Sequence, residues 1–123
     1  MANDETKDGR AKFDLEERTA LFGESVIGFA KRITAGPVTL PLISQLVRSA
    51  TSVGANYCEA NDADSKRDFL FKIGLCRREA KETKHWLRMV VAAEPQLREP
   101  ARLLWQEAKE LNLIFGAIRR NGK

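Results

Sequence analysis

Residues 69–90, FLFKIGLCRREAKETKHWLRMV, decide the fold because their apolar and small positions recur with a helical period. From Phe69 to Val90, each such position follows the previous one by four or three residues. Side chains with this spacing lie on one side of an α-helix and form a single seam. The seam consists of Phe69, Ile73, Cys76, Ala80, Thr83, Leu87 and Val90. The segment therefore predicts a long helix that hides this seam against other helices.

The ends of this helix are marked by local signals. Ser65 and Asp68 have the spacing of a capping box, with Asp in place of the usual Glu. Glu94 and Pro95 stop the period, because proline cannot continue a helix. We therefore expect the helix to run from Ser65 or Lys66 to about Ala93.

Three further segments show the same period. They run from about residue 14 to 33, from 39 or 40 to 61, and from between 96 and 100 to about 120. Gly36-Pro37 and Asn121-Gly122 are stop signals after the first and the last of them. Their apolar faces consist of Leu15, Phe22, Val26, Phe29 and Ile33; Ile43, Leu46, Val47, Ala50, Val53, Gly54 and Tyr57; and Leu97, Ala101, Leu104, Ala108, Leu111, Phe115 and Ile118.

Four amphipathic helices joined by short links favour antiparallel neighbours. The sequence thus predicts an all-α, up-down-up-down four-helix bundle over residues 14–121, preceded by a flexible N-terminal tail over residues 1–13. No apolar run approaches the roughly 20 residues of a membrane span, and the polar N-terminus does not resemble a secretory signal. We expect a cytoplasmic protein that does not enter the membrane.

Catalytic and metal-binding motifs are nearly absent. The chain has no Gly-rich phosphate loop, no nucleophile elbow and no HExxH motif. His85 is its single histidine, so Glu82-x-x-His85 lacks the second Glu-x-x-His that a di-metal bundle needs. Cys58 and Cys76 are best interpreted as small apolar side chains on helix faces. We expect no metal, no cofactor and no enzymatic activity.

The chain is basic, and its charge is uneven. The net charge is +4, although residues 1–18 hold six acids and four bases and so contribute −2. In the helix over 65–93, a row of bases flanks the seam, and two more end the last helix; together they are Arg77, Lys81, Lys84, Arg88, Arg119 and Arg120. Such a surface favours sequence-tolerant contact with nucleic-acid phosphates. The alternative is a solvated face whose long stems cover apolar surface.

A polar row lies beside the apolar face of the helix over 39–61, and acids line the next helix. The row includes Arg48, Asn56 and Glu59, and the acids are Glu79 and Glu82. Arg48 has the position to pair with either acid. These five residues are interpreted as a polar network that fixes the register of the bundle. The alternative is a ligand site or an interface.

Apolar side chains also occur away from the predicted core. They are Leu70, Phe71, Leu75, Trp86, Met89, Val91, Leu103, Trp105, Leu113 and Ile114. A helix that is apolar on two sides usually packs against two neighbours. We therefore expect a homo-oligomer, with an unusually apolar monomer as the alternative.

The stretch QLVRSATSVGANYCEA, residues 45–60, resembles the hallmark segment of the 23S rRNA intervening-sequence proteins. Ser65, Asp68-Phe69, Lys72-Ile73, Glu79, Glu82-Thr83 and Trp86-Leu87 fit the same pattern. The resemblance implies a left-handed four-helix bundle, a homopentamer and no catalytic residues. More distantly, the chain is similar to the accessory variability determinant proteins of diversity-generating retroelements, which bind nucleic acid and a reverse transcriptase.

These observations favour a non-enzymatic oligomeric module that binds nucleic acid, RNA rather than DNA. A structural adaptor that docks a protein partner is the alternative. A small-molecule or metal site along the row from Arg48 to Glu59 is a third and weaker hypothesis.

Overall fold

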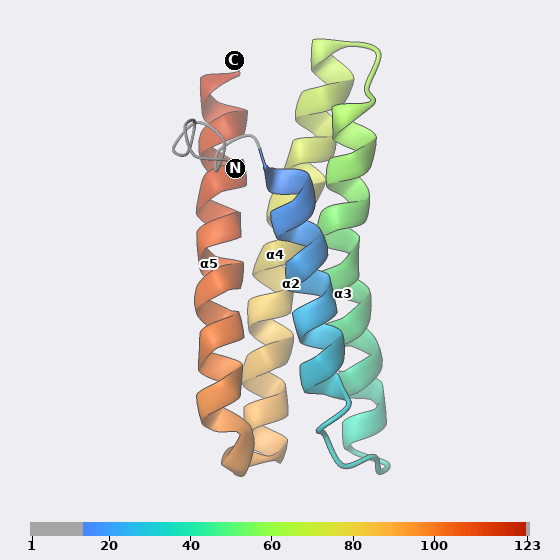
Figure 1. The fold of residues 1–123 in the computed structure, drawn as a ribbon, viewed down its shortest axis with the longest axis vertical. Coiled ribbons are helices and arrows are strands. Elements are labelled where there is room, and N and C mark those ends of the chain that lie inside the picture. The colour runs from blue at the N-terminus through green and yellow to red at the C-terminus, as the bar shows by residue number, and fades with distance from the viewer. Residues whose placement is uncertain (1–13, 123) are drawn as a thin grey trace, which may run out of the picture.

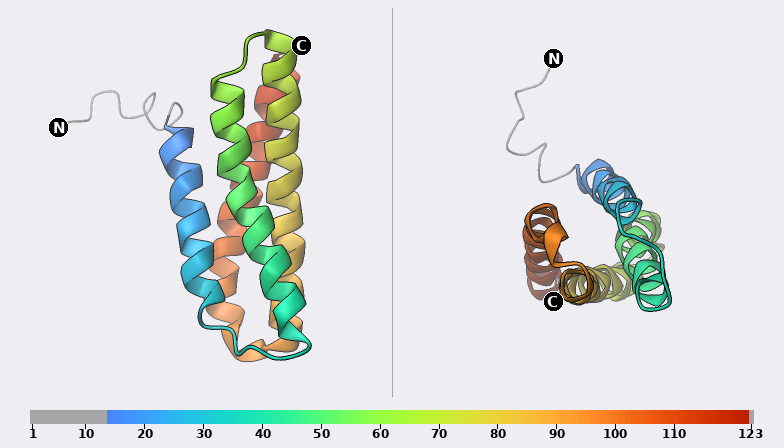
Figure 2. Two further views of the ribbon diagram at one scale, coloured as in Figure 1. Left: turned by 90° about the vertical axis from the view of Figure 1, so that its right-hand side faces the viewer. Right: turned by 90° about the horizontal axis from the view of Figure 1, so that it is seen from below.

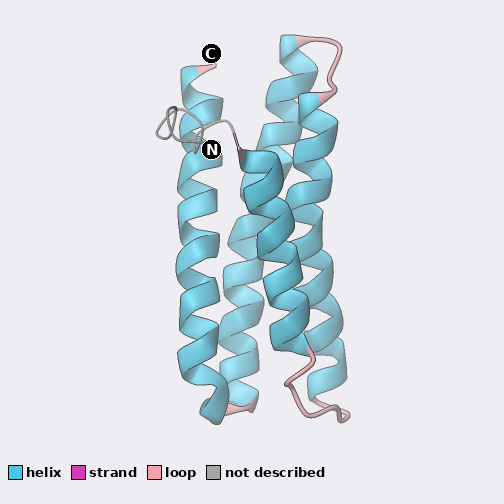
Figure 3. Ribbon diagram, in the orientation of Figure 1, coloured by secondary structure: helices cyan, strands magenta, loops and turns pink. Residues whose placement is uncertain are grey.

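The computed structural model describes residues 14–122, which form four long helices. They are α2 (Leu15–Ala30), α3 (Thr39–Asn61), α4 (Lys66–Ala93) and α5 (Arg98–Asn121), with a short 3₁₀ helix, η1 (Pro95–Leu97), before α5. Successive helices run in opposite directions (Figure 1), and no strand occurs in this part of the chain (Figure 3). The predicted all-α, up-down-up-down bundle is confirmed. The expected tail at 1–13 lies outside the described residues.

Each helix packs against the next one in the chain. The pairs α2–α3, α3–α4 and α4–α5 make the main contacts, whereas α2 touches α5 only lightly. Figure 2 shows the four helices end-on, following one another around the bundle. Short links explain this order, because they bring each helix directly back along its predecessor.

The predicted seam of α4 lies at the centre of the bundle. Ile73, Cys76, Ala80 and Thr83 are 0% exposed, and Leu87 and Val90 are equally hidden. Large side chains of the other helices meet them, with Leu46 from α3 and Phe115 from α5 also fully buried. Burial of each large apolar side chain contributes about 1.5–3 kcal/mol, so this seam supplies much of the driving force for folding.

One polar pair lies inside this core. The Thr83 hydroxyl of α4 donates to the Ser49 hydroxyl of α3 at 3.0 Å, and Ser49 in turn donates to the Leu46 carbonyl at 3.2 Å. Both side chains are completely buried. Because neither hydroxyl lacks a partner, the pair fixes how α3 and α4 meet without leaving an unsatisfied group.

The helix ends agree with the sequence in part. Ser65 accepts a hydrogen bond from the Asp68 backbone N–H at 3.0 Å, as the capping pattern predicts. The expected end of the first helix at Ile33 was wrong, because α2 stops at Ala30, and the backbone N–H groups of Arg32 and Ile33 bond backward by only three positions. This tighter turn still keeps Ile33 buried.

Gly122 ends α5 for a reason other than a left-handed backbone. Its φ is −79°, which any residue adopts. A Cβ at this position would lie 2.6 Å from Leu70 Cδ2 of α4. The glycine therefore permits α5 to end against the beginning of α4.

Candidate nucleic-acid interface

The carboxylates of α4 and α5 lie mostly on the sides that face α3 and α2. On α4, Glu79 and Glu82 bind Arg48 of α3, at 3.3 Å and 2.8 Å. The Arg48 Nε also donates to Gln45 at 3.1 Å. Two of the acids of α4 are therefore paired on the side of the helix that faces α3.

A similar arrangement occurs on α5. Arg18 of α2 donates to both oxygens of Glu107, at 2.7 Å and 2.9 Å, and to Glu110 at 2.9 Å. The hydrogen bond to Glu107 is the main reason that the pKa of Arg18 lies above its ordinary value. Two acids of α5 are thus directed to the α2 side.

The outer surface that runs along both α4 and α5 is rich in bases. We call this surface the α4–α5 basic face and define it by the eight bases Arg77, Lys84, Arg88, Arg98, Arg102, Lys109, Arg119 and Arg120. Glu99 is the acid among them, and it binds Arg102 within the same helix at 2.9 Å. A strip with this excess of cations has a positive potential that attracts polyanions.

At one end of this face, three guanidinium groups surround a small pocket. Arg77 of α4 and Arg119 and Arg120 of α5 line it together with Gly116, and its volume is about 170 Å³. None of the three side chains forms an ion pair with a carboxylate within residues 14–122. We call this the arginine pocket; its chemistry suits a phosphate group, which guanidinium groups bind through parallel N–H donors.

Two glycines allow the arginine side chains to lie close to the helices. A Cβ on Gly74 would lie 3.1 Å from Arg119 Nε, and one on Gly116 would lie 3.6 Å from Arg77 Cδ and Arg120 Nη1. The Asn112 side chain of α5 also donates to the Arg77 carbonyl at 2.8 Å, which ties the two helices together beside the pocket.

Trp105 of α5 lies near the middle of the face. Lys84 Nζ of α4 is 4.9 Å from the centroid of its ring, and Lys109 Nζ is 5.7 Å away. Both are cation–π distances. The indole is therefore partly buried against the core and has two cations beside its ring.

Beyond Trp105, toward η1, a groove of about 560 Å³ separates α4 and α5. We call it the Trp105 groove. Leu87, Val91 and Ala101 give it an apolar lining, and Arg88, Arg98 and Arg102 surround this lining. Trp105, apolar side chains and arginines thus line the same groove.

The structure shows which of the predicted phosphate-binding residues lie together. Arg77 meets Arg119 and Arg120, which had appeared only as cations near one end of the bundle. Lys81 is exposed on the same helix, and Arg88 lies at the Trp105 groove. The interpretation missed Arg98, Arg102, Trp105 and Lys109, although their steps of four, three and four along α5 carried the signal.

The proposed polar network divides into separate contacts. Arg48, Glu79 and Glu82 form one cluster, whereas Glu59 pairs with Lys72 nearer the other end of α3. Asn56 does not reach α4, because its amide donates to the Ser52 carbonyl of its own helix at 2.9 Å. The hydrogen bond of Asn56 within α3 therefore does not support its predicted interhelical role.

The remaining sequence candidates are two cysteines and one histidine. Both cysteines lie on helices, Cys58 on α3 and Cys76 on α4, and Cys76 is buried whereas Cys58 is exposed. His85 is exposed and packs edge-on against Trp86. Within residues 14–122, no three acidic, histidine or cysteine side chains cluster in a way that would hold a metal ion, and no helix is long and apolar enough to cross a membrane.

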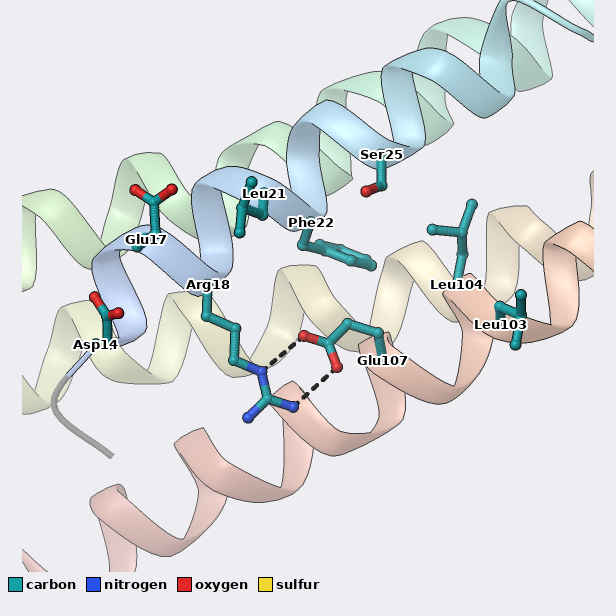
Figure 4. A pocket seen from close by; sticks show the side chains of 9 residues that line it. All are labelled: Asp14, Glu17, Arg18, Leu21, Phe22, Ser25, Leu103, Leu104 and Glu107. Carbon is teal, nitrogen blue, oxygen red and sulfur yellow. Dashed lines mark hydrogen bonds and ion pairs between the residues drawn. The ribbon is translucent and has the colours of Figure 1, made fainter. Parts of the chain in front are cut away.

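A second groove, of about 420 Å³, lies where α2 and α5 touch lightly (Figure 4). Leu21, Phe22, Leu103 and Leu104 form its apolar part, and the Arg18–Glu107 pair spans it. Leu103 is 75% exposed and Leu21 is 50% exposed. This groove differs from the Trp105 groove in having a single arginine, Arg18, which is paired with Glu107.

Comparison with known proteins agrees with the fold. A crystal structure of a protein of unknown function from the S23 ribosomal protein family of Bacteroides thetaiotaomicron VPI-5482 superposes with a TM-score of 0.78 at 28% sequence identity, covering 85% of this chain and 97% of the other. No curated protein matches the chain. The sequence model of the 23S rRNA-intervening sequence protein family matches residues 18–116, most of the chain. The chain therefore belongs to the 23S rRNA-intervening sequence protein family.

Proposed function

We propose that this protein is a non-enzymatic module that binds nucleic acid, RNA in preference to DNA, through the α4–α5 basic face. The observation that carries the proposal is the segregation of charge on two helices. Glu79, Glu82, Glu107 and Glu110 bind arginines of α3 and α2, while eight bases remain on the side shared by α4 and α5.

This arrangement favours phosphate contact over recognition of base sequence. Lysine and arginine side chains that bind phosphates release counterions, and this release supplies most of the affinity of sequence-independent binding. Phosphate contacts fix position and carry no sequence information by themselves. The expected binding is consequently tolerant of sequence and weakened strongly by salt.

Reversal of charge on this face tests the proposal. Arg77→Glu/Lys84→Glu changes the charge by four units on the face, and Lys31→Glu/Arg32→Glu makes the same change at exposed positions after α2. Fluorescence anisotropy with labelled RNA at about 50 mM salt should show loss of binding for the first variant and near wild-type binding for the second. Equal loss in both variants, or no loss in either, contradicts the assignment of the face.

We further propose that the module acts as a homo-oligomer, a pentamer by resemblance to its family. The support is the exposure of large apolar side chains, with Leu103 at 75%, Phe71 at 61% and Leu113 at 60%. The same side chains favour the alternative, an adaptor that docks another protein. Light scattering after size exclusion measures the oligomer size, whereas stable pull-down of a partner protein together with no nucleic-acid affinity near physiological salt would favour the adaptor.

A further inference from the structure

Building on the proposed function, we infer that the Trp105 groove takes an unpaired base of a single-stranded nucleic acid, stacked on Trp105, while the arginines around the groove bind the adjoining phosphates. The α4–α5 basic face is thus a single-strand site rather than a duplex site. Charge alone does not distinguish these two ligands, so the inference depends on the indole and the groove.

The first argument is the environment of Trp105. A tryptophan beside two lysines, at 4.9 Å and 5.7 Å, lies where both a π surface and positive charge are available. Proteins that bind single strands without sequence preference combine these two features, because every base has a face that stacks and every nucleotide has a phosphate.

The second argument is the shape and lining of the groove. Its volume of about 560 Å³ is in the range of small-ligand sites. Val91 and the largely buried Leu87 and Ala101 give the groove an apolar lining. Arg88, Arg98 and Arg102 lie at its border, together with Glu99, which pairs with Arg102. A base in a duplex is stacked on its neighbours and shows only its edges, so it cannot place its face on Trp105.

The third argument is the continuity of the cationic strip. Arg102 and Arg119 are 17 positions apart on α5, which corresponds to about 25 Å of helix. Lys84 and Lys109 lie at Trp105, between the groove and the arginine pocket. A strand that places one base in the groove therefore meets further phosphate-binding side chains along its course.

The experiment compares three ligands with equal numbers of phosphates: a uridine homopolymer, a paired RNA hairpin and an abasic strand. Wild-type protein should bind the uridine strand about tenfold more tightly than the abasic strand at the same salt concentration. This ratio corresponds to ~1.4 kcal/mol of binding free energy. Trp105→Leu keeps an apolar side chain but removes the π surface. This substitution should weaken binding of the uridine strand about tenfold and leave binding of the hairpin and of the abasic strand unchanged.

Two controls keep the outcome interpretable. Trp105→Phe retains a stacking ring and should recover part of the lost affinity. The abasic comparison requires no variant, so it holds even where Trp105→Leu lowers stability. In a Trp86→Phe background, Trp105 is the only tryptophan of the chain, and its fluorescence should be quenched by the uridine strand and not by the abasic strand.

The inference is overturned by equal wild-type affinity for the uridine and abasic strands, or by a Trp105→Leu variant that weakens all three ligands equally. These outcomes differ from failure of the proposed function, in which none of the ligands binds at low salt or Arg77→Glu/Lys84→Glu binds as well as wild type. Loss of hairpin and uridine binding upon charge reversal, together with no effect of Trp105→Leu, keeps the face and rejects the stacking site.

Discussion

Arg119 of α5 lies across Gly74 of α4, so closely that a Cβ at position 74 would be 3.1 Å from its Nε and 3.3 Å from its Cζ. Such distances are shorter than ordinary van der Waals contact. The absence of a side chain at Gly74 therefore leaves room for Arg119 beside Arg77 and Arg120 at the arginine pocket.

Gly74→Ala tests this relationship without any change of charge. The added methyl group should move the Arg119 side chain away from the pocket and weaken RNA binding by roughly two- to fivefold, less than loss of a full phosphate contact. Stability should not fall by much, because alanine favours the helix by ~1 kcal/mol over glycine. Gly28→Ala is the matched control, since no atom lies within 4 Å of a Cβ there. Equal affinities for the two variants contradict a role for the position of Arg119.

Ser49 and Thr83 should be coupled in stability. Thr83→Val and Ser49→Ala each remove one hydroxyl of a buried hydrogen bond and should lower the free energy of unfolding by about 1 kcal/mol. The double variant should lose less than the sum of the two, because the hydrogen bond between the two hydroxyls is lost only once. Urea denaturation of the four proteins measures the coupling energy. Strict additivity means that the two hydroxyls do not stabilise the core as a pair.

Arg18 should tie α2 to the rest of the bundle. The contact of α2 with α5 is light, and the hydrogen bonds from Arg18 to Glu107 and Glu110 cross between them. Arg18→Met keeps the aliphatic stem and should cost about 1 kcal/mol, since the side chains of Arg18 and Glu107 remain about one-third exposed. Amide hydrogen exchange should accelerate in Leu15–Ala30 more than in α3 or α4. Uniform acceleration in all helices contradicts this local role.

The two cysteines should differ in reactivity. Burial raises the pKa of the Cys76 thiol from 9.0 to about 12, whereas Cys58 is exposed. An aromatic disulfide reagent at pH 8 should therefore modify one thiol in the folded protein and two after denaturation. Rapid reaction of both thiols in the folded protein means that Cys76 is accessible.

The same thiol should make stability depend on pH in the alkaline range. Above pH 9 the unfolded chain releases the Cys76 proton while the folded chain retains it, so deprotonation favours unfolding. The contribution is complete below pH 9 and is lost as pH rises toward 12. The difference in unfolding free energy between wild type and Cys76→Ala should shrink over this range; a constant difference contradicts it.

The seam of α4 could be predicted from sequence because its period depends only on the geometry of one helix. Ile73, Ala80 and Leu87 lie on one side of any α-helix, whatever partner they meet. The Ser65 cap is equally local. The early end of α2 was not predictable in this way, since Ile33 remains buried after the helix has stopped.

The arginine pocket and the Trp105 groove depend on the register of two helices. Gly74 meets Arg119, and Lys84 meets Trp105, only because η1 sets where α5 begins relative to the end of α4. A row of bases on one helix predicts that a basic surface exists. It does not reveal that the separate row of Arg98, Arg102 and Lys109 on the next helix completes the same surface.

The salt dependence of RNA binding tests the central claim most directly. For a single strand, each phosphate contact contributes about 0.7 to the slope of log K against log salt concentration. Arg77→Gln/Arg119→Gln/Arg120→Gln should lower this slope by about 2 relative to wild type, and Lys31→Gln/Arg32→Gln should leave it unchanged. A triple variant with the wild-type slope and affinity would contradict the claim that the α4–α5 basic face holds the phosphates.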